Sequence, residues 1–138
     1  MTAFDKFMRL LFFVAFVVDV LLGLICVFFA GWVQRTLQLP LEQEPVFLRM
    51  LGLFPTFVGY LYYLIFRDMK KYHALIQVTV VERFMYPVIL SAELLFLLPN
   101  PSAILTISFI VMAVITLFLA IMQTVYLRRE NLPVPLLN

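Results

Sequence analysis

Four apolar segments of membrane-spanning length constrain this chain more than any other feature of its sequence. They cover roughly residues 9–33, 46–66, 74–98 and 103–127, and short polar stretches join them. At a rise of 1.5 Å per residue, a helix of about 20 residues crosses the roughly 30 Å hydrocarbon core of a bilayer. The pattern therefore predicts an all-α protein, a membrane-spanning antiparallel four-helix bundle that forms a single transmembrane domain over residues 1–138.

The composition excludes a water-soluble globule and several kinds of chemistry. Of the 138 residues, 64% are hydrophobic and only 13% are charged, so we expect the lipid bilayer as the main partner. The net charge of +2 is too small to indicate nucleic-acid binding. The single cysteine, Cys26, lies inside an apolar segment, and the single histidine, His73, lies in a polar link. We therefore predict no metal site, no haem and no catalytic residue.

Lysine and arginine residues are distributed unevenly between the two ends of the predicted spans. The connections that alternate with the basic ones contain only Arg35, whereas the two termini and the second link hold bases at positions 6, 9, 67, 70, 71, 128 and 129. The positive-inside rule then predicts cytoplasmic N- and C-termini.

Near the last span, Asn100 or Ser102 is expected to cap the helix, and residues 130–138 are expected to form a surface or docking segment. Interfacial aromatic belts are expected to include Trp32 and Tyr126 near span ends, and Tyr62, Tyr63 and Tyr72 around the second link.

Five charged residues lie within the spans: Asp19, Arg49, Glu82, Arg83 and Glu93. From the cytoplasmic ends, Asp19 lies about 13–16 Å deep and Arg83 about 8–13 Å deep, at 1.5 Å per residue. Arg49 and Glu93 lie about 6 Å and 8 Å from the opposite surface by the same count. We therefore predict that Asp19 pairs with Arg83 and that Arg49 pairs with Glu93.

Two interpretations of these buried charges remain open. They are either ties that fix helix order, or part of a ligand-binding or proton-handling seam. Three acids face two bases, so one carboxyl group, of Asp19 or Glu82, is expected to hold its proton at neutral pH. The candidate seam consists of Asp19, Arg49, Tyr60, Glu82, Arg83, Tyr86 and Glu93.

The stretch "FLRMLGLFPTFVGYLYYLIFRDMKKYHALIQVTVVERFMYPV" has an arginine and a glycine early in the second span. It also has "GYLYY" ending in "RD", and an arginine early in the third span. In these features it resembles small bacterial four-helix membrane proteins of the DoxX-like kind. The resemblance implies a four-helix bundle in the bacterial inner membrane, and it brings no substrate and no catalytic residue.

Two hypotheses of function follow. The first is a non-catalytic accessory or scaffold subunit that associates with other membrane-protein subunits, or with itself, through its lipid-facing surfaces. The alternative is a binder, carrier or enzyme for a hydrophobic small molecule, such as a lipid, quinone or pigment, held at the charged seam. A cavity lined by the seam would favour the alternative, and a fully paired core would favour the scaffold.

Overall fold

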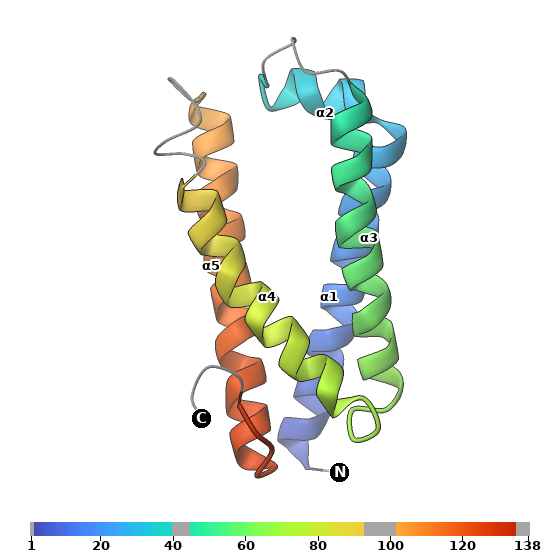
Figure 1. Cartoon of the computed structure of the whole chain (residues 1–138), viewed down its shortest axis with the longest axis vertical. Coiled ribbons are helices and arrows are strands. Elements are labelled where there is room, and N and C mark those ends of the chain that lie inside the picture. The colour runs from blue at the N-terminus through green and yellow to red at the C-terminus, as the bar shows by residue number, and fades with distance from the viewer. Residues whose placement is uncertain (1, 40–44, 93–101, 135–138) are drawn as a thin grey trace. The chain divides into compact units, whose positions relative to one another are not determined.

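The computed structural model describes residues 2–39, 45–92 and 102–134. Regular structure in these ranges is helical: α1 (Ala3–Phe28), α2 (Ala30–Thr36), α3 (Pro45–Arg67), α4 (His73–Ala92) and α5 (Ala103–Arg129) (Figure 1). Four of these helices, all except the short α2, are long and apolar enough to cross a membrane. Four such helices indicate a multi-pass membrane protein.

Helix contacts divide the chain into two compact units, residues 1–71 and residues 72–138. In the first unit α1 packs along α3, and α2 contacts both; in the second unit α4 packs along α5 (Figure 1). The α1–α3 pair is antiparallel, because Gly59 of α3 approaches Val20 of α1 whereas Gly52 approaches Cys26. The predicted assembly of both pairs into one four-helix domain stays a prediction.

The first helix begins earlier than the apolar pattern predicts. Thr2 and Asp5 form a capping box, in which the Thr2 amide donates to Asp5 Oδ2 at 2.6 Å and the Asp5 amide donates to Thr2 Oγ1 at 3.2 Å. These bonds satisfy amides that have no partner inside the helix. Helix α1 can therefore start in the polar segment before residue 9, and it carries Lys6 and Arg9 on its first turns.

The prediction of one continuous helix over residues 9–33 is wrong at its end. Helix α1 stops at Phe28, and Phe29 adopts φ −117° and ψ 30°, outside the helical region. Hydrogen bonding resumes at once, because the Trp32 and Val33 amides donate to the Phe29 carbonyl at 2.9 and 3.0 Å. Gly31, which follows this bend, is a poor helix former. Interrupting the helix next to it therefore costs little free energy.

Helices α2 and α5 end in the same left-handed turn. Gln38 (φ 55°) follows α2 and Asn131 (φ 53°) follows α5. After each, the next amide donates back to the third residue from the helix end, Leu39 to Gln34 and Leu132 to Leu127, at 3.0 and 2.9 Å. This is the Schellman motif, in which glycine or asparagine is favoured at the left-handed position.

Helix α5 begins and ends as its polar flanks suggest. Ser102 is the N-cap, and its hydroxyl accepts a hydrogen bond from the Leu105 amide at 3.2 Å, as predicted. After α5 the chain turns back onto α4, where Gln77 Nε2 donates to the Pro133 carbonyl at 2.9 Å. Val134 is buried next to this contact. The described part of the C-terminal segment is thus docked within the second unit.

Candidate functional site

Glycine residues bring the backbones of α1 and α3 into direct contact. A Cβ atom added to Gly23 would lie 2.5 Å from the Gly52 carbonyl oxygen, and one added to Gly52 would lie 2.7 Å from the Gly23 carbonyl oxygen. Gly59 is equally enclosed, with Val20 Cγ2 at 2.7 Å. Between them, the Thr56 hydroxyl donates to the Gly52 carbonyl at 2.9 Å. These small residues therefore form a helix–helix seam, here called the glycine seam, of the kind found in membranes.

Where α1 begins and α3 ends, a contact between an arginine and an aromatic ring holds the two helices together. Arg9 Nε donates to the Phe66 carbonyl at 3.0 Å, and the guanidinium carbon lies 5.0 Å from the centre of the Phe66 ring. A cation suits this position because the carbonyls at a helix C-terminus carry partial negative charge. Tyr62, expected at the interface, is instead fully buried and stacks on Phe12 at 6.0 Å, because its ring fits between the helices.

Asp19 lies on the buried stripe of α1. It is 6% exposed and shares this stripe with Met8, Phe12, Ala15 and Gly23 at helical spacing. Burial of a carboxyl group requires a hydrogen-bonding partner or a proton. Asp19 belongs to the first unit and the predicted partner, Arg83, to the second, so their pairing stays a prediction.

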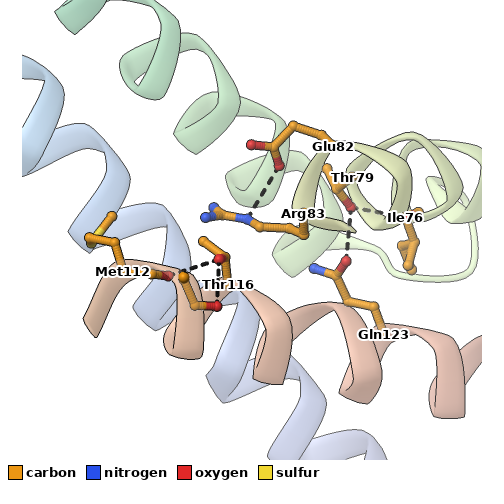
Figure 2. Close-up of polar contacts among 8 residues, drawn as sticks. Ile76, Thr79, Glu82, Arg83, Met112, Thr116 and Gln123 are labelled. Carbon is orange, nitrogen blue, oxygen red and sulfur yellow. Dashed lines mark hydrogen bonds and ion pairs between the residues drawn. The ribbon is translucent and has the colours of Figure 1, made fainter. Parts of the chain in front are cut away.

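In the second unit, the buried Arg83 and the half-buried Glu82 form an ion pair on α4. Arg83 Nε lies 3.3 Å from Glu82 Oε2, and the two side chains are 5% and 19% exposed (Figure 2). Consecutive residues do not face each other on a helix, so sequence spacing alone does not suggest this contact. The pair offsets part of the desolvation cost of each charge. It joins two of the predicted seam residues directly.

One helical turn away from the ion pair, a polar contact joins α4 to α5. Thr79 Oγ1 lies 3.0 Å from the Ile76 carbonyl and 3.4 Å from Gln123 Oε1 (Figure 2). A hydroxyl has one proton, so the shorter bond within α4 dominates and the contact with Gln123 is the weaker one. On α5 the buried Thr116 hydroxyl lies 2.8 Å from the Met112 carbonyl. These groups make the α4–α5 interface polar in its centre.

The remaining seam candidates are divided between the two units, so their assembly into one seam stays a prediction. Arg49 is exposed on α3, and Tyr60 is 54% exposed and stacks with Tyr63 at a ring distance of 6.4 Å. Tyr86 is half-buried on α4. Glu93 lies outside the described residues, so its predicted pairing with Arg49 stays a prediction.

Two buried glutamines were missed by the sequence analysis. Gln34 of α2 is 7% exposed and Gln123 of α5 is 1% exposed. A signal for Gln123 exists, because it continues the stripe of Thr116 and Ala120 at helical spacing within an apolar span. Its amide carries no charge, yet amide side chains also form hydrogen bonds between helices in a membrane.

The described residues supply an ion pair within α4 and hydrogen bonds between helices, from Arg9 to Phe66 and between Thr79 and Gln123. Within residues 2–39, 45–92 and 102–134, no group of three or more His, Cys, Asp or Glu side chains could hold a metal ion. The polar side chains lie on helices, which position them rigidly. Comparison of the chain with protein-family models, with curated proteins and with solved structures finds no match in any of the three.

Proposed function

We propose that this chain is a multi-pass integral membrane protein that acts as a non-catalytic accessory or scaffold subunit of a larger membrane complex. The observation that carries the proposal is that small residues lie between α1 and α3, whereas large apolar residues lie on the outside of the pair. Gly23, Gly52 and Gly59 lie in the seam, whereas large apolar side chains such as Phe57 and Leu21 are exposed. In lipid, close backbone contact between small residues drives association, and large apolar residues face the acyl chains.

The use of the hydroxyl groups supports a structural role. Thr56, Thr116 and Thr124 each lie 2.8–2.9 Å from the carbonyl oxygen four residues earlier. Ser91 does the same with the Pro87 carbonyl at 2.7 Å. A hydroxyl that donates to its own helix satisfies itself locally and is not directed at a general base. These contacts support helix packing as the task of the polar groups.

The proposal includes a bacterial inner-membrane location, membership of the DoxX-like kind and cytoplasmic termini. The distribution of bases supports the orientation. The Arg9–Phe66 hydrogen bond joins the start of α1 to the end of α3, so Lys6, Arg9 and Arg67 share one end of the first unit. That end would face the cytoplasm.

Membrane extraction and native electrophoresis test the two parts of the proposal separately. An integral protein should stay in the membrane pellet at alkaline pH in carbonate, and extraction into the supernatant would contradict membrane insertion. After solubilisation in mild detergent, a scaffold subunit should migrate in a complex larger than its own dimer, with other subunits identified by mass spectrometry. Migration as a monomer would contradict the scaffold role.

Cysteine labelling tests the orientation. The Cys26→Ser background should first be shown to be stably produced, and single cysteines are then introduced at positions 2 and 136 and, as the opposite-side control, at position 38. An impermeant maleimide added to intact cells should label position 38 and leave both terminal positions unlabelled until the cells are opened. Labelling of either terminus from outside would refute the orientation.

A second function, binding of a hydrophobic small molecule such as a lipid, quinone or pigment, is favoured by the burial of Asp19 and Arg83. Buried ionisable groups in membrane spans often mark ligand or proton sites. Mass spectrometry of the natively purified protein would detect a stoichiometric ligand. Its loss from an Arg83→Gln variant that remains folded, with retention in an Arg128→Gln control, would favour this function over the scaffold.

A further inference from the structure

The first unit carries three basic side chains at the end where α1 begins and α3 ends, next to a row of aromatic rings that contact one another. The basic group, here called the cationic rim, consists of Lys6, Arg9 and Arg67. Next to the rim, toward the middle of the two helices, lies an aromatic flank made of Phe13, Phe16, Tyr60, Tyr63 and Phe66. Both belong to α1 and α3 alone. The arrangement is built from contacts along these two helices.

Helical spacing and ring contacts place these residues on one surface. Lys6, Arg9 and Phe13 follow each other on α1 at spacings of three and four, which puts them on one face. Across the helix pair, the ring of Phe13 lies 5.2 Å from that of Phe66, and the ring of Phe16 lies 5.3 Å from that of Tyr63. The surface therefore continues from one helix to the other.

The flank extends along both helices away from the rim. Phe13 lies about 6 Å further along α1 than Arg9, and Tyr60 lies about 10 Å from Arg67 along α3, at 1.5 Å per residue. Phe13 and Tyr60 remain 41% and 54% exposed. This length matches the glycerol backbone and the first part of an acyl chain rather than a small soluble anion.

The rim is available for an anion. Arg9 is held by its Nε bond to the Phe66 carbonyl, and within the described residues its two Nη groups make no hydrogen bond. Lys6 and Arg67 are exposed, and within the described residues neither side chain makes a hydrogen bond or an ion pair.

The nearby acids do not neutralise this end of the unit. The Asp5 carboxylate accepts a hydrogen bond from the Thr2 amide, and the Asp68 carboxylate accepts one from the Lys71 amide at 3.0 Å. Residues 1–9 and 67–71 together contain five bases and two acids, so the local charge is positive. Positive charge of this kind attracts anionic lipid headgroups at the membrane surface.

We propose that the cationic rim and the aromatic flank form a binding site for one anionic phospholipid, whose phosphodiester lies on Lys6, Arg9 and Arg67 and whose acyl chain lies along α1 and α3. The proposal rests on the membrane location proposed above. Charge complementarity selects the headgroup, and the exposed rings select a hydrocarbon chain. A zwitterionic lipid of the same chain length carries no net charge and should bind more weakly.

The test uses the full chain purified in a nonionic detergent. Thermal unfolding, followed by intrinsic fluorescence, is measured with increasing dioleoyl phosphatidylglycerol, and native mass spectrometry counts the bound lipid. We expect stabilisation by one tightly bound phosphatidylglycerol and little from dioleoyl phosphatidylcholine. Equal stabilisation by both lipids would overturn the proposal. So would equal stabilisation by inorganic phosphate or by the free glycerophosphoglycerol headgroup, since either would indicate a simple anion site.

The decisive variant is the double substitution Lys6→Gln and Arg67→Gln, which leaves the Arg9–Phe66 contact in place. Loss of two surface cations should weaken phosphatidylglycerol binding roughly 25-fold. The matched control is Arg35→Gln with Arg128→Gln, which removes the same charge from exposed positions outside the rim and should weaken binding less than about threefold, because surface charge away from a site is screened. Equal losses in both double variants would overturn the site in favour of diffuse attraction.

Two further outcomes distinguish lipid binding from self-association and from loss of the membrane location. If a dimer forms through the flank, is lost in Tyr60→Ala and is indifferent to phosphatidylglycerol, a second copy of the chain occupies the surface and the lipid site is wrong. Carbonate extraction is read independently. A protein that stays in the membrane pellet yet shows no preference for phosphatidylglycerol refutes the lipid site alone, whereas release by carbonate refutes the membrane location itself.

Discussion

The glycine seam gives the sharpest test of the fold, through substitution of Gly23 by alanine. The added Cβ would lie 2.5 Å from the Gly52 carbonyl oxygen and 2.8 Å from the Thr56 amide nitrogen, and it would overlap the Thr56 hydroxyl. Two of these three neighbours are backbone atoms, which no rotamer change can move. To reach an ordinary contact distance, α1 and α3 must separate by about 0.9 Å at this point.

The expected cost follows from that separation. A gap of 0.5–1 Å forfeits about a quarter to a half of the dispersion attraction between the facing atoms, and overpacking of a tight interface costs about 1–3 kcal/mol. Alanine recovers up to about 1 kcal/mol through its better helix propensity. Gly23→Ala should therefore lower the free energy of unfolding by about 1–2 kcal/mol.

Gly31→Ala is the matched control, because its added Cβ would meet only Arg35 Nη2 at 3.9 Å. This substitution should leave stability unchanged or raise it by up to about 1 kcal/mol. Unfolding of both variants in mixed micelles, titrated with a denaturing detergent and followed by circular dichroism, measures the difference. If Gly23→Ala is as stable as the Gly31→Ala control, α1 and α3 do not pack through Gly23 and the seam is wrong.

Three further predictions concern single contacts. Arg9→Gln should destabilise the protein by about 1–2 kcal/mol through loss of the bond to the Phe66 carbonyl and of the cation–π contact, with Arg9→Lys recovering only part; an unchanged unfolding midpoint in micelles would contradict the contact. Thr79→Val and Gln123→Leu should couple by roughly 0.6 kcal/mol in a double-mutant cycle, and strict additivity would show that the two side chains do not interact. Gln38→Gly should stabilise the protein by about 0.5–1 kcal/mol because it relieves a left-handed backbone, whereas a loss of stability would argue against the turn after α2.

Much of the helical structure could be predicted from sequence because a helix in lipid must satisfy its own backbone. Every amide and carbonyl in the hydrocarbon needs an internal partner, so an apolar run of about 20 residues is committed to helix without reference to the rest of the fold. Local chemistry also decides helix ends, as Ser102 shows at the start of α5. The sequence also contains the small-residue face of α3, since helical spacing places Gly52, Thr56 and Gly59 on one side of the helix.

Tertiary structure decided which side chains meet. Tyr62 looks like an interfacial anchor in the sequence, yet it stacks on Phe12 inside the helix pair. Gln123 looks unimportant beside the charged residues, yet it is buried against Thr79. The sequence determined the number, length and chemical faces of the long helices, because those depend on spacing along one chain segment. The partners of each face depend on how far apart two helix axes lie and how far each side chain reaches, and spacing along a single helix contains no information about either.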